Sequence, residues 1–147
     1  MNGNNRYIRQ INLPQIGPQG QQKIENASVL VIGAGGLGCA ILPYLAASGV
    51  GRLGIMDEDI ISESNLHRQV LYTAADISKP KVIVAEKKIK AINPKVQVVS
   101  INAYLTAKNA LKTIREYDLI VDATDVIAAR YLINDACVLE NKAFVHA

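Results

Sequence analysis

The stretch "SVLVIGAGGLG", residues 28–38, is the strongest indication of the fold class. It begins with a short apolar run that predicts a buried strand, and it leads into residues 36–50, which have the pattern of a helix. Gly33, Gly35 and Gly38 lie at the junction with G-x-G-x-x-G spacing. The first glycine permits a tight turn, the second lets the backbone approach a phosphate, and the third lets the helix pack on the strand. Because the N-terminus of a helix favours an anion, this unit predicts a phosphate-binding turn.

Short apolar strands alternate with helical patterns along the rest of the chain. Further strands are predicted at residues 52–57, 96–101, 118–123 and 143–147, and further helices at residues 80–92, 107–116 and 127–140. This alternation is typical of a parallel sheet with helices on both faces. Right-handed crossovers then give the strand order 3-2-1-4-5. We therefore expect an α/β, Rossmann-like, doubly wound and mainly parallel sheet.

The chain divides into two predicted parts. Residues 1–27 mix Pro, Gly and Gln in loop and helix, and we expect an N-terminal helical arm appended to the sheet, with residues 28–147 as the nucleotide-binding domain. Gly49 is predicted to end the first helix of that domain in a left-handed turn. Pro43 removes one hydrogen bond from the same helix and should bend it. Because no capping helix follows the last predicted strand, we expect this sequence to be part of a longer protein.

Composition excludes several classes of protein. The chain has 147 residues, of which 50% are hydrophobic, and a net charge of +3, which suits one globular domain. The charge is too small, and aromatic residues too few, for a nucleic-acid surface, and no apolar run approaches the roughly 20 residues of a membrane span. Cys39 and Cys137 lie far apart in predicted helices, so we expect buried core residues in a reducing cytoplasm. The chain has no C-x-x-C pair for a zinc ribbon.

An acidic residue ends the second predicted strand. Asp57 follows Gly38 by about 20 residues, the spacing at which a carboxylate accepts hydrogen bonds from the ribose hydroxyls of a bound nucleotide. This residue alone is compatible with NAD or with a nucleoside triphosphate.

The loop after Asp57, "DEDIISESNLHRQVLY" (57–72), indicates which nucleotide is bound. Arg68 can offer a planar fork to phosphate oxygens, Asn65 and Gln69 can orient a phosphate or a neighbouring backbone, and Lys81 can add a point charge. In "DATD" (122–125), Asp122 and Asp125 end a strand at the sheet edge where ligands sit, and a carboxylate there suits Mg²⁺. An arginine, a lysine and a magnesium carboxylate favour a triphosphate.

Each of these side chains also has a purely structural interpretation. Arg68 could be a surface ion-pair partner, Lys81 an exposed lysine at a helix start, and Asp125 the N-cap of the following helix. We interpret His67 as an ordinary loop residue. The remaining lysines of residues 79–90 are expected to form a solvated helix face.

Five segments, in order along the chain, resemble the N-terminal half of the ThiF/MoeB family, relatives of the ubiquitin-activating enzymes. These segments are "RYIRQINLPQIGPQGQQKI", "GAGGLG", "DEDIISESNLHRQ", "KPK" and "DATD". The resemblance implies ATP- and Mg²⁺-dependent adenylylation of the C-terminal glycine of a ubiquitin-like sulfur-carrier protein, of the molybdopterin- or thiamine-synthesis type, with release of pyrophosphate. It also implies a homodimer.

The resemblance assigns roles to residues of this chain. It implies catalytic roles for Arg9, Arg68, Lys81 and Asp125, with Asp125 binding the metal and Arg9 reaching the γ-phosphate in the partner subunit's site. It implies nucleotide contacts from residues of the glycine turn and of the loop that follows the second strand: Gly33, Gly35, Gly36, Gly38, Asp57, Asp59, Ser64, Asn65, Arg68, Gln69 and Lys81. Zinc is expected only beyond residue 147, in the family's C-terminal part.

One departure from the family keeps alternatives open. Val126 stands where the family usually has Asn, so we expect one polar contact to the nucleotide or metal to be missing. An NAD-binding oxidoreductase domain is one alternative, although hydride transfer would leave Arg68, Lys81 and Asp125 without a task. A truncated, non-catalytic module that dimerises or docks a carrier is the other, and Val126 favours it.

Overall fold

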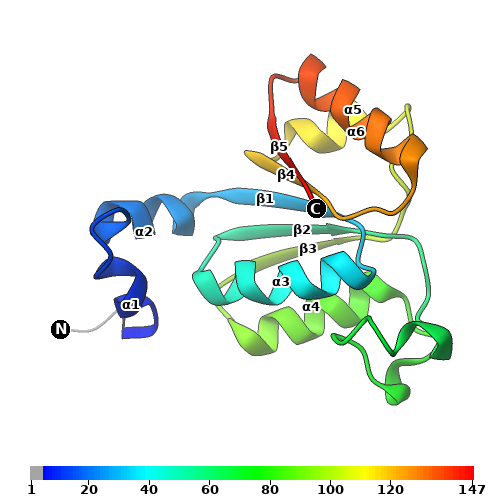
Figure 1. The fold of residues 1–147 in the computed structure, drawn as a ribbon, viewed down its shortest axis with the longest axis horizontal. Helices are drawn as coiled ribbons and strands as arrows, with labels where there is room; N and C mark the ends of the chain where they lie inside the picture. The colour runs from blue at the N-terminus through cyan, green and yellow to red at the C-terminus, as the bar shows by residue number, and fades with distance from the viewer. Residues whose placement is uncertain (1–4) are drawn as a thin grey trace.

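A five-stranded sheet forms the centre of the molecule (Figure 1). The computed structural model describes residues 5–147, and residues 1–4 of the expected N-terminal arm lie outside it. The strands are β1 (Ser28–Ile32), β2 (Arg52–Met56), β3 (Gln97–Ile101), β4 (Leu119–Asp122) and β5 (Ala143–His146). All neighbours pair in parallel in the order β3-β2-β1-β4-β5. The predicted fold class and strand order are therefore confirmed.

Helices cover both faces of the sheet. α3 (Gly36–Ser48) and α4 (Lys81–Ile92) lie on one face, and α5 (Ala110–Arg115) and α6 (Ile127–Leu139) lie on the other (Figure 1). Side chains of β1 alternate between the two layers, with Val29 and Val31 in the core under α3 and α4, and Leu30 and Ile32 in the core under α5 and α6. Each of the four is at least 97% buried, and burial of such a side chain stabilises the fold by about 1.5–3 kcal/mol.

Packing within the protein requires glycine in this turn, whether or not a ligand is bound. Gly33 has φ +101°, and a Cβ there would lie 2.5 Å from the carbonyl oxygen of Ala123. A Cβ on Gly38 would overlap the carbonyl oxygen of Gly33. These contacts hold β1, α3 and the end of β4 together at the carboxyl edge of the sheet. Gly49 ends α3 with φ 90°, as predicted.

The N-terminal arm packs against the opposite, amino edge of the sheet. It comprises a 3₁₀ turn (Asn5–Tyr7), α1 (Ile8–Ile11) and α2 (Gly17–Asn26). The Tyr7 side chain is 2% exposed, and its hydroxyl accepts a hydrogen bond of 2.8 Å from Asn93 Nδ2. Gln10 Nε2 donates to Gln21 Oε1 at 2.8 Å, and both amides donate to the carbonyl of Ser48.

Three local features differ from the predictions or refine them. α5 begins at Ala110, three residues later than expected, because Asn109 Oδ1 accepts the backbone N–H of Thr106 and holds a turn before the helix. Pro43 lies within α3, which continues through it to Ser48. Two further 3₁₀ turns, Glu63–Asn65 and Ala74–Asp76, shape the loop between β2 and α4.

Between residues 5 and 147, no helix has both the length and the apolar character that crossing a membrane requires.

Candidate functional site

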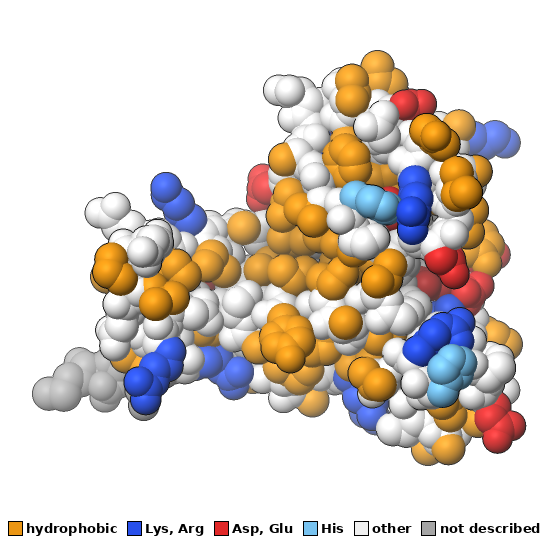
Figure 2. Space-filling view, viewed as in Figure 1, with side chains coloured by type: hydrophobic (Ala, Val, Ile, Leu, Met, Phe, Trp, Pro, Cys, Tyr) orange, Lys and Arg blue, Asp and Glu red, His pale blue; other side chains and the backbone are white. Residues whose placement is uncertain are grey.

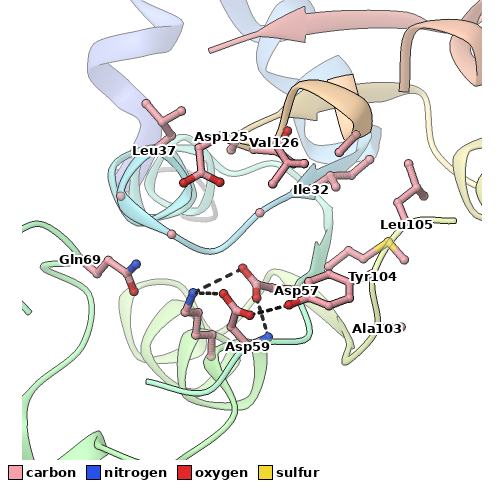
Figure 3. A pocket seen from close by; sticks show the side chains of 18 of the residues that line it. Ile32, Leu37, Asp57, Asp59, Gln69, Ala103, Tyr104, Leu105, Asp125 and Val126 are labelled. Atoms are coloured by element: carbon pink, nitrogen blue, oxygen red, sulfur yellow. Dashed lines mark hydrogen bonds and ion pairs between the residues drawn. The ribbon is translucent and has the colours of Figure 1, made fainter. Parts of the chain in front are cut away.

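A cavity of about 800 Å³ opens at the carboxyl edge of the sheet (Figure 3). Its wall includes the glycine turn, the end of β2, the loop between β2 and α4, the start of α4, and the segments that follow β3 and β4. Ligands of open α/β sheets bind beyond the carboxyl ends of the strands. Ten of the predicted site residues line this cavity: Gly33, Gly35, Gly36, Asp57, Asp59, Asn65, Arg68, Gln69, Lys81 and Asp125.

Asp57 is tied directly to the glycine turn. Its Oδ2 accepts the backbone N–H of Ala34 at 2.7 Å, and its Oδ1 accepts the N–H of Asp59 at 2.8 Å. The side chain is only 9% exposed, so the surrounding protein holds it in place. A carboxylate oxygen can accept more than one hydrogen bond, so both oxygens remain available to a ligand hydroxyl.

Lys81 is the first residue of α4, and its ammonium lies in the cavity wall. Its side chain is 5% exposed, and Nζ lies 2.7 Å from Asp59 Oδ2 and 4.0 Å from Asp57 Oδ2 (Figure 3). The interpretation of Lys81 as an exposed helix-start lysine is therefore wrong. Tyr104 donates its hydroxyl to the other oxygen of Asp59 at 2.7 Å.

These contacts change the pKa of Asp59 and the pKa of Tyr104. The hydrogen bond from Lys81, followed by the one from Tyr104, lowers the pKa of Asp59 below its ordinary value. The hydrogen bond that Tyr104 donates to the Asp59 carboxylate raises the pKa of Tyr104 to about 12. At neutral pH the Asp59 carboxylate is therefore ionised and the Tyr104 phenol is protonated.

Arg68 lies beside the glycine turn, and no acidic side chain of residues 5–147 pairs with it. The nearest atoms to a Cβ built on Gly36 belong to the Arg68 side chain, at 3.7 Å. Arg68 Nη1 donates to the carbonyl of Ser64 at 3.3 Å and lies 3.4 Å from His67 Nε2. Within residues 5–147 its guanidinium forms no ion pair, so the interpretation of Arg68 as an ion-pair residue is wrong.

The two amides of this loop have different environments. Asn65 Oδ1 accepts the backbone N–H of Ser62 at 3.2 Å, which closes a capping box on the 3₁₀ turn. Gln69 is 3% exposed, and its Oε1 is buried without a hydrogen-bond partner in the described part of the chain. A buried polar atom of this kind costs about 1–3 kcal/mol unless a ligand or water satisfies it.

Asp125 lies at the cavity rim, and its carboxylate is unpaired among the described residues. The N-cap of α6 is Val126, and no side chain caps that helix, so the N-cap interpretation of Asp125 is wrong. Across residues 5–147 the Asp125 carboxylate makes no hydrogen bond or ion pair, although the residue is exposed and lines the cavity.

Asp122, the other candidate at this edge, is used within the fold. It is fully buried, and its Oδ1 accepts the backbone N–H and the hydroxyl of Thr124 at 3.0 and 2.7 Å. Its Oδ2 lies 2.9 Å from His146 Nδ1. The expectation that Asp122 shares the ligand edge with Asp125 is therefore corrected.

Three predicted residues do not reach the cavity wall. Gly38 is buried beneath the glycine turn, where it serves close packing. Ser64 is exposed in the loop, and its hydroxyl lies 2.9 Å from that of Ser62. Arg9 is exposed on α1, and α1 belongs to the arm at the amino edge of the sheet, away from the cavity of its own chain.

The sequence did not predict a second group of wall residues. Tyr104 and Thr124 supply hydroxyls. Apolar residues form the remaining wall: Ile32, Leu37, Met56, Ala103, Leu105, Ala123, Val126, Ala128, Ala129 and Leu132. The place of these residues in the sequence was one indication that they line the site, because residues that directly follow β3 and β4 must lie at the carboxyl edge of the sheet. No pattern in the sequence distinguished Tyr104 from the rest of its loop.

These side chains fit a magnesium-bound triphosphate. Two cations, Lys81 and Arg68, line the same cavity as the free carboxylate of Asp125. In the part of the chain that the structure covers, no three His, Cys, Asp or Glu side chains form a metal cluster. Mg²⁺ needs none here, because it is usually bound by one or two carboxylates together with phosphate oxygens. Asp125 would supply that carboxylate.

The fold and the cavity define this chain as an α/β domain of the doubly wound type, with a ligand-sized cavity at the carboxyl edge of its sheet. The ThiF family matches residues 7–147, and the chain belongs to this family. A sulfur carrier protein adenylyltransferase of Thermus thermophilus is 54% identical over 140 residues, which are 95% of this chain and 52% of the relative. The adenylyltransferase and sulfurtransferase MOCS3 of Danio rerio is 48% identical over 142 residues, 97% of this chain and 31% of the relative. The chain thus spans about half or less of these relatives.

Solved structures share the same architecture. E. coli MccB with succinimide has a TM-score of 0.87 and 30% sequence identity, and the match covers 100% of this chain and 45% of MccB. The E. coli tRNA N6-threonylcarbamoyladenosine dehydratase, TcdA, in complex with ATP has a TM-score of 0.90 and 24% identity, and the match covers 96% of this chain and 58% of that chain. The second likeness is one of fold alone.

Proposed function

We propose that this chain binds MgATP and forms the nucleotide-binding half of an adenylyltransferase. Its substrate is the C-terminal glycine of a ubiquitin-like sulfur-carrier protein of the molybdopterin- or thiamine-synthesis type, and pyrophosphate is the second product. Membership of the ThiF family and the names of relatives with about 50% identity support this proposal.

One observation carries the proposal. Lys81, Arg68 and Asp125 come from three different elements and line one cavity with the glycine turn. A nicotinamide dinucleotide has two bridging phosphates and needs no carboxylate for a metal. A triphosphate with Mg²⁺ uses two cations and one carboxylate.

Each side chain has a defined task in this proposal. Asp57 accepts the ribose hydroxyls, and the backbone at Gly35 and Gly36 approaches the phosphates at the start of α3. The Arg68 guanidinium offers a planar pair of N–H donors to phosphate oxygens. The Lys81 ammonium has three donors, of which Asp59 uses one, so the others remain for phosphate.

The reaction needs positioning and charge neutralisation. A carboxylate oxygen of the carrier attacks the α-phosphorus, a bond to that phosphorus forms, and the bond to the leaving pyrophosphate breaks. No residue has to remove a proton, because a C-terminal carboxyl with a pKa of about 3.5 is already ionised at neutral pH. Arg68 and Lys81 offset the charge that develops on the phosphate oxygens. Mg²⁺ on Asp125 would supply further charge stabilisation to the phosphates.

In this proposal, Arg9 of one subunit contributes to the nucleotide site of the other subunit. It is exposed on α1 and makes no hydrogen bond or ion pair within residues 5–147. A homodimer would bring it to the phosphates of the partner subunit. Exposed apolar side chains on α3, α6 and β5 suit such an association: Tyr44, Tyr131, Val138, Leu139 and Val145. Hydrophobic side chains gather in the middle of one face (Figure 2).

The cytosol is the proposed location. Cys39 and Cys137 are free and buried, and burial raises the pKa of both thiols. Free cysteines without disulfides suit a reducing compartment.

Pyrophosphate exchange into ATP tests the proposal. The protein is incubated with MgATP, labelled pyrophosphate and a carrier that ends in Gly-Gly, with a carrier that lacks the terminal glycine as control. We expect label in ATP only with the intact carrier. Absence of exchange together with tight NAD binding would favour the oxidoreductase alternative, and ATP binding without exchange would favour the non-catalytic module.

A further inference from the structure

The end of β4 contains a buried carboxylate that the proposed reaction does not use. Asp122 is 0% exposed, and both of its oxygens are engaged. Oδ1 accepts two hydrogen bonds from Thr124, one from the N–H at 3.0 Å and one from the hydroxyl at 2.7 Å. Oδ2 lies 2.9 Å from Nδ1 of His146, at the end of the neighbouring strand β5.

These contacts determine the path of the backbone up to Asp125. The N–H of Ala123 donates to Ile32 on β1 at 2.9 Å, and the carbonyl of Thr124 accepts Arg130 Nη2 at 3.0 Å from α6. Residues 123 and 124 are thus held from β1, α6 and Asp122. The carboxylate of Asp125 has no partner of its own in residues 5–147, so its position depends on this backbone.

We propose that Asp122 is a positioning residue for the metal carboxylate: it holds the turn of residues 122–125 and thereby places Asp125 at the cavity rim. This inference rests on the proposed function for the identity of the metal, Mg²⁺ bound with ATP. When a residue that orients a metal ligand without touching the metal is removed, metal affinity falls by about 10–100-fold. Asp122 acts through the backbone and touches neither metal nor nucleotide.

The chain provides a matched control at the other end of the same strand. Asp118 immediately precedes β4, and its Oδ2 accepts the N–H of Ser28 at 2.8 Å and the hydroxyl of Ser28 at 2.7 Å. Both aspartates therefore bind one backbone N–H and one hydroxyl, but Asp118 lies at the amino edge of the sheet. If substitutions at both positions reduce metal affinity equally, the cause is a general loss of stability. If only the substitution at position 122 reduces it, the cause is a change at the cavity.

The first measurement needs no ligand. Amide hydrogen exchange is followed at residues 123–126 in the wild type, Asp122→Leu, Asp122→Asn and Asp118→Leu. Leucine keeps the branched arrangement of heavy atoms, although its two methyl groups are larger than the carboxylate oxygens, and it cannot accept the Thr124 bonds. Asparagine keeps one acceptor oxygen. We expect exchange at Thr124 to rise about tenfold or more in Asp122→Leu, because the free energy of local opening falls. Asp122→Asn and Asp118→Leu should retain the protection of Thr124.

The second measurement is metal affinity. Mn²⁺ replaces Mg²⁺, and free Mn²⁺ is followed by electron paramagnetic resonance during titration into protein saturated with ATP. We expect Asp122→Leu to bind Mn²⁺ about 10–100-fold more weakly than the wild type, Asp122→Asn to recover most of the affinity, and Asp118→Leu to match the wild type. If Asp122→Leu does not fold, Asp122→Ala takes its place with the same expectation.

The outcomes separate the two proposals. If the wild type binds no Mn²⁺ with ATP, the proposed function fails, and the role of Asp122 toward a metal fails with it. If the wild type binds Mn²⁺ and the leucine variant binds it equally well, only the assignment of Asp122 is overturned. Equal losses in the variants of Asp122 and Asp118 would also overturn it, because they would show a loss of stability alone.

Discussion

The two edges of one sheet treat their polar side chains in opposite ways. At the amino edge, Tyr7 bonds to Asn93, Gln10 bonds to Gln21, and Asp118 bonds to Ser28, so these side chains satisfy one another. The buried hydroxyl of Tyr117 is an exception, because it has no hydrogen-bond partner in residues 5–147. At the carboxyl edge, three groups in the cavity wall are less fully paired in the part of the chain that the structure describes. Gln69 Oε1 and the Asp125 carboxylate have no hydrogen-bond partner, and the Arg68 guanidinium has no acidic partner and contacts only the Ser64 carbonyl and His67.

This difference separates stability from function. A polar group that is paired within the protein contributes about 0.5–1.5 kcal/mol per hydrogen bond to folding. A polar group that the fold leaves unpaired contributes little or costs free energy, and it is available to a ligand. Substitutions at the amino edge should therefore change unfolding, and substitutions at the carboxyl edge should change nucleotide chemistry.

The largest effect is expected from a free cation at the carboxyl edge. Arg68→Ala should lower the rate of pyrophosphate exchange by about 10²–10³-fold, the cost of removing one charge-stabilising donor. Its free energy of unfolding should change by less than about 0.5 kcal/mol, because the side chain is exposed and forms no ion pair within residues 5–147.

The control is a paired arginine at the amino edge. Arg52 lies 3.6 Å from Glu116 and its guanidinium is 4.6 Å from the centre of the Tyr117 ring. Arg52→Ala should lower stability by about 0.5–1 kcal/mol and leave exchange unchanged. Near wild-type exchange in Arg68→Ala would show that the cavity does not hold phosphates through this residue.

Much of this contrast could be predicted from the sequence. The spacing of Gly33, Gly35 and Gly38 after an apolar run indicated the turn, because only glycine fits where Ala123 and Gly33 carbonyls approach. Regular alternation of strands and helices then determined the strand order, since right-handed crossovers leave few topologies. Asp57 was predicted from its position at the end of a strand.

The direction of individual side chains could not be predicted in the same way. Asp122 and Asp125 are three residues apart in one acidic motif, yet one is buried and the other faces the cavity. Their directions depend on the turn between them and on Thr124 and His146, which are contacts made in three dimensions. Tyr104 likewise reaches Asp59 from another loop, and sequence separation hides that contact.

A pair of glycines with positive φ gives the next largest effect. Gly33→Ala and Gly49→Ala should each lower the free energy of unfolding by about 2–4 kcal/mol, because a Cβ would lie 2.5 Å from Ala123 at the first and 2.6 Å from Tyr7 at the second. Only Gly33→Ala should also weaken ATP binding, because it moves the turn in the cavity. Calorimetric titration with MgATP and urea unfolding separate the two results. Equal ATP affinity in both variants would contradict the contrast between the edges.

A smaller loss is expected where the arm is anchored. Tyr7→Phe removes the acceptor of the Asn93 bond and should cost about 1–2 kcal/mol of unfolding free energy. The Asn93 amide still donates to the carbonyl of Ala46, so Asn93 loses only part of its hydrogen bonding. Binding of MgATP should be unchanged, as measured by the same titration. A large fall in ATP affinity would mean that the arm acts on the cavity of its own chain.

The smallest effect concerns pH. Lys81 lowers the pKa of Asp59, so the stabilisation is present above the ordinary value of 3.8 and is lost as the pH falls through the lower pKa of the folded state. Ser28 lowers the pKa of Asp118 in the same direction at the other edge. Thermal unfolding of the wild type, Asp59→Asn and Asp118→Asn is compared from pH 7 to below pH 3.

Both variants should be less stable than the wild type at neutral pH, by about 0.5 kcal/mol for the half-exposed Asp59 after solvent screening. Both differences should vanish in the acid range, because protonation removes the same charge that asparagine lacks. A difference that stays constant down to the lowest pH would mean that shape, and not charge, accounts for the loss. Since paired carboxylates at both edges obey the same linkage, acid sensitivity cannot mark a functional carboxylate in this fold. Within residues 5–147, Asp125 is distinguished by a carboxylate that has no protein partner, and its removal should weaken metal binding.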